Sequence, residues 1–278
     1  MTFRVVVVNP KGGSGKTTIA TNLLAAYARA ERRTALIDRD RQGSAIRWLK
    51  HRALTLPSIH GIAAYEDPPP NVTRSFAMRI PPDTERVVVD TAAALTRHEL
   101  VDAVRNADKI VVPVLPSVID IHAATRCISD LLVHAKVPRG RGVLGVVANR
   151  VKRNTVTYQA LMRFLDSLGV PVVAVIRDVQ IYVRAAESGR GVVDLKPSEA
   201  GPELRQWRAL MGWIDRNEVP VRGPVREPAA PDPEPAHTGE DASMAQSLLQ
   251  LLHLDHGRDS DARDGTRQNR GSGDGRCG

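Results

Sequence analysis

The chain of 278 residues has few cysteines and no long apolar run, and these shortages exclude several classes of protein. Cys127 and Cys277 are too few for a disulfide framework, and no CxxC or HExxH spacing indicates a metal site. No apolar run approaches the length of about 18 residues that crosses a bilayer. Hydrophobic residues still make up 42% of the chain, which is typical of a globular core. We therefore expect a reduced protein of the cytoplasm.

Acidic residues are scarce in most of the chain and more frequent near its end. Residues 1–216 contain 32 basic and 20 acidic residues, a net charge of +12. Residues 217–278 contain 7 basic and 11 acidic residues, a net charge of −4. A body this basic is suited to a polyanionic partner, because contacts with phosphates release condensed counterions. An arginine-rich genomic composition explains the same excess, so charge alone leaves both interpretations open.

Composition also divides the chain into four parts. Residues 1–216 are expected to form the folded domain. Residues 217–242 are rich in proline, alanine and acid, which is typical of an extended linker. Residues 243–256 include the apolar segment SMAQSLLQLLHL, which predicts one short helix. Residues 257–278 have almost no apolar side chains, and we expect them to be disordered.

Within the first part, apolar runs rich in valine and isoleucine alternate with segments of helical period. The runs cover residues 3–9, 34–38, 86–90, 109–114, 142–149 and 170–176, and the helical patterns include 17–30, 98–107, 119–135 and 155–168. Near-continuous apolarity indicates strands that are buried on both faces of a parallel sheet. The alternation predicts an α/β domain with a doubly wound, mostly parallel sheet and helices on both faces. Ligands of such sheets bind beyond the carboxyl ends of the strands.

A glycine-rich loop follows the first expected strand and opens the first expected helix. Its sequence is Pro10-Lys11-Gly12-Gly13-Ser14-Gly15-Lys16-Thr17-Thr18. The glycines let backbone N–H groups close on phosphate oxygens, and the helix N-terminus adds partial positive charge. We expect residues 12–18 to bind a nucleotide, with Lys16 reaching the β- and γ-phosphates and the Thr17 hydroxyl completing a Mg²⁺ shell. The order of strand, loop and helix predicts the P-loop NTPase fold, and a plain strand–helix turn is the weaker alternative.

Carboxylates stand at the ends of two further expected strands. Asp38 and Asp40 end the second run and point to the same side of the chain, because they are two residues apart. The run Arg86-Val87-Val88-Val89-Asp90 resembles a Walker B strand, in which Asp90 holds Mg²⁺. Without the glycine-rich loop, an acid in either place is more often a helix cap or a solvated turn.

Taken together, these motifs resemble the ParA/MinD family of P-loop ATPases. Lys11 at the front of the loop gives the deviant Walker A form KGGxGKT[ST], and residues 38–44 are similar to the family's D-x-D-P-Q-G-S segment. Residues 113–120 and 176–189 also match family segments, so that the resemblance spans residues 3–214. The family has proline where this chain has Arg41 and Ala92, and we expect both loops to be less rigid as a result.

The resemblance implies an ATPase in which ATP and Mg²⁺ are sandwiched between two copies of the chain. It implies that Lys11 reaches the nucleotide of the second subunit, that Asp38 acts near Mg²⁺ and that Asp40 orients the attacking water. The catalytic set is then Lys11, Lys16 and Asp40, and the metal set is Thr17, Asp38 and Asp90. Asn149, at the end of a strand, is expected to contact the adenine edge, although a turn residue is the alternative. Hydrolysis is expected to be slow until a partner stimulates it.

The resemblance further implies a ParA-type protein that partitions or positions a cargo on the nucleoid. The cargo is a plasmid, a chromosome or a protein body such as a carboxysome, and a ParB-like or other adaptor protein stimulates hydrolysis. The ATP homodimer is expected to bind duplex DNA without sequence preference. The candidate DNA contacts are Lys152, Arg153, Arg184, Arg190, Arg205 and Arg208. We accordingly expect a cytoplasmic, nucleoid-associated protein.

A membrane-associated positioning ATPase of MinD type is the main alternative. Such proteins end in an amphipathic helix that has basic residues on its polar face. Residues 243–254 carry the apolar stripe Met244, Leu248, Leu251 and Leu252, but they contain no lysine or arginine and are flanked by acids. Because anionic lipid repels such a segment, we do not expect membrane binding. Nitrogenase-type reductases are disfavoured by the shortage of cysteine, and amidoligases by the lack of a second substrate domain.

Overall fold

The computed structural model describes residues 2–139, 141–152, 155–167 and 169–216. Arg153 and the linker, short helix and tail expected over 217–278 lie outside these residues. The strands are β1 Phe3–Val7, β2 Thr34–Asp38, β3 His60–Ala63, β4 Arg86–Asp90, β5 Lys109–Val114, β6 Leu144–Val151 and β7 Val172–Arg177. The helices are α1 Lys16–Arg29, α2 Ser44–Lys50, α3 Arg74–Ala77, α4 Arg97–Val104, α5 Val118–Val133, α6 Val156–Ser167, α7 Ile181–Glu187 and α8 Pro197–Asp215, and a 3-10 helix, η1, spans Val192–Asp194.

The strands form one parallel sheet in the order β3-β2-β4-β1-β5-β6-β7. This arrangement confirms the predicted α/β class and the P-loop NTPase fold. The central strand β1 lies between β4 and β5, so the strand order reverses there and leaves a crevice at the carboxyl end of β1. The glycine-rich loop begins in that crevice. Strands β2 and β5 are buried at every residue, as their continuous apolarity predicts.

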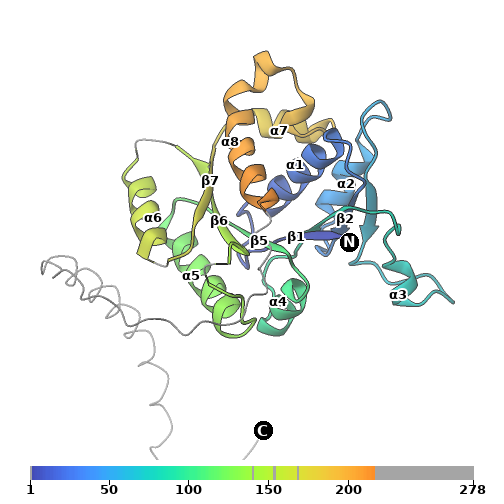
Figure 1. Cartoon of the computed structure of the whole chain (residues 1–278), viewed down its shortest axis with the longest axis horizontal. Helices are drawn as coiled ribbons and strands as arrows, with labels where there is room; N and C mark the ends of the chain where they lie inside the picture. Colours follow the sequence, from blue (N-terminus) through green and yellow to red (C-terminus); the bar gives the residue numbers. More distant parts are fainter. Residues whose placement is uncertain (1, 140, 153–154, 168, 217–278) are drawn as a thin grey trace, which may run out of the picture. The chain divides into compact units, whose positions relative to one another are not determined.

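Helices cover both faces of the sheet (Figure 1). On one face, α1, α2, α7 and α8 contribute side chains such as Leu23, Trp48 and Trp207 to a buried cluster. On the other face, α4, α5 and α6 contribute side chains such as Ile128 and Leu161. The sheet is therefore fixed from both sides, and the loops at its carboxyl edge are held by buried elements. None of the helices in the described part is long and apolar enough to cross a membrane.

The expected helical patterns do not include α7, α8 or the short elements at the β3 edge of the sheet. Strand β3 has only one fully buried residue, Ile62, and contains Gly61, so it shows no apolar run. Backbone pairing with β2 therefore stabilises β3, because few of its own side chains are buried. Helix α2 likewise has only Ala45 and Trp48 buried, which is too few for a recognisable helical period.

Candidate functional site

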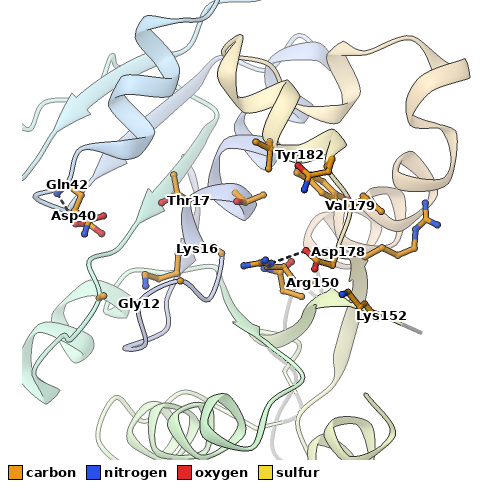
Figure 2. A pocket seen from close by; sticks show the side chains of 18 residues that line it. Gly12, Lys16, Thr17, Asp40, Gln42, Arg150, Lys152, Asp178, Val179 and Tyr182 are labelled. Carbon is orange, nitrogen blue, oxygen red and sulfur yellow. Dashed lines mark hydrogen bonds and ion pairs between the residues drawn. The ribbon is translucent and has the colours of Figure 1, made fainter. Parts of the chain in front are cut away.

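A cavity of ≈ 690 Å³ opens at the carboxyl ends of β1, β6 and β7 (Figure 2). Its lining comes from the glycine-rich loop, from Asp40 and Gln42 after β2, and from the segments 149–152 and 177–183. Figure 2 shows Lys16 and Thr17 on one side of the cavity and Asp178, Val179 and Tyr182 on the other. Segments that are far apart in the sequence thus meet around one space, at the place where the sheet topology predicts a ligand.

The glycine-rich loop is shaped by Gly15 and closed by Asn149. Gly15 has a φ of +92°, and a Cβ at this position would lie 2.1 Å from the Nδ2 atom of Asn149. The side-chain amide of Asn149 donates a hydrogen bond of 2.9 Å to the Ser14 carbonyl, and Asn149 is buried. Only glycine satisfies both the backbone angle and this close approach. In this structure Asn149 therefore supports the loop, and its contact with adenine stays a prediction.

Lys16 is held inside the cavity wall by the loop itself. Its Nζ atom donates a hydrogen bond of 3.1 Å to the carbonyl of Lys11, and the residue is only 6% exposed. Burial lowers the pKa of Lys16 from its usual value, while the charges of Asp90 and Asp40 oppose that shift. The loop thus positions an ammonium group where a ligand phosphate can replace the lost hydration.

Thr17 and Asp90 form the pair on which a Mg²⁺ site depends. The Thr17 hydroxyl donates to Asp90 Oδ2 at 2.8 Å, whereas Asp90 Oδ1 is buried and has no hydrogen-bond partner among the described residues. Burial, the largest cause, raises the pKa of Asp90 to about 7. A hydroxyl and a carboxylate with a free oxygen fit Mg²⁺, which prefers few protein oxygens together with water and phosphate. The part of the chain that is described holds no cluster of three or more His, Cys, Asp or Glu side chains that could hold a metal ion.

Both carboxylate oxygens of Asp38 accept hydrogen bonds from backbone N–H groups. Its Oδ1 atom accepts a hydrogen bond from the Asp40 N–H, and its Oδ2 atom accepts one from the Ile46 N–H, each at 3.0 Å. Burial raises the pKa of Asp38, and these hydrogen bonds oppose the shift. In this conformation Asp38 caps the start of α2. A helix cap is the alternative that the sequence offers to a role near Mg²⁺. The action of Asp38 near Mg²⁺ stays a prediction.

Asp40 lines the cavity on a tight turn that Asp38 helps to hold. The Gly43 N–H donates to the Asp40 carbonyl at 2.8 Å, and the Gln42 N–H donates to Asp40 Oδ1 at 2.9 Å. The turn is therefore closed although Arg41 stands where the family has proline. Asp40 remains partly exposed at the cavity wall, and its role in orienting the attacking water stays a prediction.

Lys11 lies away from its own cavity and pairs with Asp120 at the start of α5. Its Nζ atom is 2.6 Å from Asp120 Oδ2, and the Ser117 hydroxyl donates to the same oxygen. The backbone of the lysine is fixed by Asn9, whose Oδ1 atom accepts the Lys11 N–H at 2.9 Å. Asp120 was part of a segment that matches the family, but its contact with a residue 109 positions earlier leaves no trace in the sequence.

The far end of the cavity contains residues to which the sequence assigned no function. Arg150 Nε lies 3.0 Å from Asp178 Oδ1, and both side chains line the cavity (Figure 2). Tyr182 is buried, and its hydroxyl accepts a hydrogen bond of 3.2 Å from Trp207 Nε1. Together with Val179 they form a wall of mixed polarity, which suits a heterocyclic base. Asp178, Val179 and Tyr182 lie in the segment 176–189 that resembles the family, but the resemblance gave them no function, and no motif singled out Arg150.

The proposed DNA contacts are spread over three parts of the chain, after β6, on and after α7, and on α8. Five of the six are described and exposed: Lys152 after β6, Arg184 on α7, Arg190 in the following turn, and Arg205 and Arg208 on α8. None of these five side chains forms an ion pair with another residue that the structure describes. Their charges are thus available to an external anion, and their contact with DNA stays a prediction.

Comparison with known proteins agrees with this geometry. Residues 5–192 match the CobQ/CobB/MinD/ParA nucleotide binding domain. The maintenance of carboxysome distribution protein A of Gloeobacter kilaueensis is 30% identical over 214 residues, which cover 77% of this chain and 94% of that protein. The protein of the same name from Halothiobacillus neapolitanus is 29% identical over 211 residues, which cover 73% of this chain and 94% of that protein.

A solved structure extends the comparison to the fold. The septum site-determining protein MinD of Pyrococcus horikoshii, complexed with Mg-ADP, covers 78% of this chain and 97% of its own. The TM-score is 0.56 at 17% identity, so this likeness concerns the fold alone. The family match extends from β1 through the glycine-rich loop, Asp40 and Asp90 to the start of η1, and the chain belongs to the ParA/MinD family of nucleotide-binding domains.

Proposed function

We propose that this protein is a ParA-type ATPase whose ATP-bound homodimer positions a cargo on the DNA of the nucleoid. ParA and MinD proteins are ATPases, so the family supports the reaction class. The observation that carries the proposal is the arrangement of the glycine-rich loop. Lys16 and Thr17 line the cavity of their own chain, with Asp90 buried behind Thr17. Lys11, in contrast, is not in the lining and pairs with Asp120. The loop therefore supplies Lys16 to the nucleotide of its own chain and leaves Lys11 for the nucleotide of a neighbouring chain.

In the proposed reaction, water attacks the γ-phosphorus of ATP and gives ADP and phosphate. The loop N–H groups and Lys16 bind the phosphates and stabilise the charge that develops on them. Thr17 and Asp90 would hold Mg²⁺, which neutralises charge on the β- and γ-phosphates when it is bound. Asp40, at the cavity wall, orients the attacking water. Asn149 and the wall around Tyr182 receive the adenine.

The dimer gives Lys11 its function in this scheme. On dimerisation the lysine leaves Asp120 and reaches the nucleotide of the second subunit. Both sites then contain cationic groups from two chains, so ATP favours the dimer and hydrolysis dissolves it. A partner protein that stimulates hydrolysis would set the lifetime of the dimer.

A protein body is the cargo that the relatives favour. The two relatives named for carboxysome distribution are covered over 94% of their own lengths, so the likeness spans almost the whole of each. We infer that this chain distributes a large protein assembly, with an adaptor as its partner. Plasmid and chromosome partition are the alternatives. Identification of the adaptor protein would distinguish among the three cargoes.

The test of this function uses the Asp40→Ala variant, which should bind ATP without hydrolysing it. With Mg-ATP we expect a dimer by light scattering and binding to random-sequence duplex DNA by fluorescence anisotropy. The affinity should fall steeply with salt, because each phosphate contact releases counterions. Lys16→Ala is the control that should give neither dimer nor DNA complex. Equal DNA binding with ADP and ATP, or a monomer at saturating Mg-ATP, would contradict the proposal.

A MinD-type membrane switch is the second candidate, because the fold is also similar to that of MinD. The expected short helix over 243–256 is the segment that would have to bind lipid, and its flanking acids argue against this. Flotation of the Asp40→Ala variant with anionic liposomes and Mg-ATP separates the two candidates. We expect the protein to remain in the bottom fraction, and ATP-dependent flotation would favour the MinD-type function.

A further inference from the structure

The turn that follows α7 lies in unusually close contact with two helices beside the cavity. Gly189 has a φ of +64°, and a Cβ on it would lie 2.3 Å from the backbone nitrogen of Arg52, just after α2. A Cβ on Gly191 would lie 2.5 Å from the Cβ of Ala25 on α1. Both glycines are required for the chain to approach so closely. The turn is therefore fitted between α1 and the end of α2.

A buried ion pair fixes this contact. The guanidinium of Arg52 lies 2.8 Å from Asp194 Oδ2, and the two side chains are 3% and 0% exposed. The same guanidinium donates to the Gly189 carbonyl at 3.1 Å and lies over the ring of Trp48. Trp48 on α2 in turn donates from Nε1 to the Arg190 carbonyl at 3.2 Å. An ion pair this deeply buried holds one geometry, because breaking it leaves an uncompensated charge in the core.

Both partners of this junction continue into the walls of the cavity. The turn is the direct continuation of α7, and Tyr182 and Val183 of α7 line the end of the cavity that we assign to the base. Helix α2 is anchored at its other end by the hydrogen bond from the Ile46 N–H to Asp38, beside the turn that carries Asp40. The pair thus stands between the wall that receives the base and the loop that holds the hydrolytic carboxylate.

A second connection reaches the loop that binds the phosphates. The side chain of Asn22 on α1 accepts a hydrogen bond of 2.8 Å from the Val192 N–H of η1. Its amide group donates to the carbonyl of Thr18 at 2.9 Å, within the first turn of the same helix. Helix α1 is therefore the fixed element against which α2 and the turn after α7 are both held.

We propose that Arg52 and Asp194 are a positioning pair, through which a base bound at α7 sets the position of α2 and hence of Asp40. A base seated against Val179 and Tyr182 restrains α7 and the turn after it. Because the ion pair joins that turn to α2, the restraint extends to the loop at the start of α2. The inference rests on the proposed ATPase function and adds to it a contribution of the base to the geometry of hydrolysis.

The test compares two ligands that share a diphosphate group, of which only one carries the adenosine, and neither of which has a γ-phosphate that can be hydrolysed. Hydrogen exchange of the backbone amides is measured for the full chain alone, with saturating Mg-ADP and with saturating Mg-pyrophosphate. In the wild type we expect ADP to slow exchange in α2 by about threefold or more relative to pyrophosphate, since couplings of this kind change local opening severalfold. In Arg52→Lys and in Asp194→Asn this additional protection of α2 should disappear, while that of α7 remains.

Matched controls separate coupling from simple loss of stability. Arg86 is another arginine that packs on aromatic rings, Phe3 and Tyr27, but it lies at the amino end of β4. Arg86→Lys should lower the melting temperature and leave the ADP-specific protection of α2 intact. Asp194→Asn removes one charge of the pair and keeps an oxygen that can accept the Gly191 N–H, so it tests the ion pair if Arg52→Lys does not fold.

The outcomes are distinct. Retention of the ADP-specific protection of α2 in folded Arg52→Lys or Asp194→Asn would overturn the inference. Equal protection of wild-type α2 by the two ligands, while only ADP protects α7, would overturn it as well. Failure of the wild type to bind either ligand would overturn the proposed ATPase instead.

Discussion

The two ends of the nucleotide cavity are built in different ways. The phosphate end comes from one stretch of the chain, residues 10–18, and much of it is backbone. The other end is assembled from residues 149–152 and 177–183, and its contacts are made by side chains. Phosphates are small and charged, so N–H groups and one lysine suffice for them. A base requires a shaped wall, and several segments must fold together before that wall exists.

The largest effect is expected when the lysine of the phosphate end is removed. Lys16→Ala should lower the affinity for ATP, ADP and tripolyphosphate alike by about 100-fold, because charge-assisted contacts with phosphates are lost. Isothermal titration calorimetry measures the three affinities, and thermal unfolding confirms that the variant is folded. Retention of tripolyphosphate binding would show that the loop backbone alone supplies this end.

Gly15→Ala tests the place where the two ends touch. The new Cβ would lie 2.1 Å from Asn149 Nδ2 and would force a φ of +92° on alanine. We expect a loss of about 2–3 kcal/mol in the free energy of unfolding, from strain and from the displaced amide. Gly13→Ala is the matched control, since its φ of +75° is also positive but nothing lies within 4 Å of the added carbon. Urea denaturation should show a smaller loss for Gly13→Ala, and equal losses would remove Asn149 from the explanation.

Asn149→Ala sharpens the comparison, because this residue belongs to both ends. Its hydrogen bond to the Ser14 carbonyl supports the phosphate loop, and we propose that it also contacts adenine. We expect the affinity for ATP to fall about tenfold and that for tripolyphosphate about threefold, in line with the loss of one or two buried hydrogen bonds. Competition with a fluorescent nucleotide gives both values. An equal loss of affinity for the two ligands would mean that Asn149 supports the loop and does not contact adenine.

The smallest effect is expected at the outer wall of the base end. Arg150→Ala removes an arginine that is more than half exposed and that pairs with Asp178 across the cavity rim. Exposed ion pairs contribute little, so the affinity for ATP should fall by only about twofold to threefold, and that for tripolyphosphate should not change. Lys152→Ala on the same rim is the comparison variant. A loss of tripolyphosphate binding in Arg150→Ala would show that this arginine contacts the phosphates.

The sequence predicted the phosphate end and the sheet because both depend on local patterns. Continuous valine runs identify buried parallel strands, and the Gly-Lys-Thr loop opens α1 where it was expected. It did not predict the contacts of Lys11 with Asp120 or of Asn149 with Ser14, because each joins residues more than one hundred positions apart. The cap that Asp38 provides to α2 was visible only as an alternative, since a buried carboxylate at a strand end fits a cap and a metal ligand equally well.

The contact between Lys11 and Asp120 has a consequence for how the protein responds to its own abundance. The lysine already has an anionic partner within one chain, so on the proposed function it exchanges that partner for the nucleotide of a second chain. Its contribution to the free energy of assembly is then a small difference between two similar attractions, which favours a weak and readily reversible association. A weak association has a threshold, below which the chains remain single even when nucleotide is plentiful. On the proposed function, local crowding of the protein would therefore decide where on the nucleoid the switch turns on.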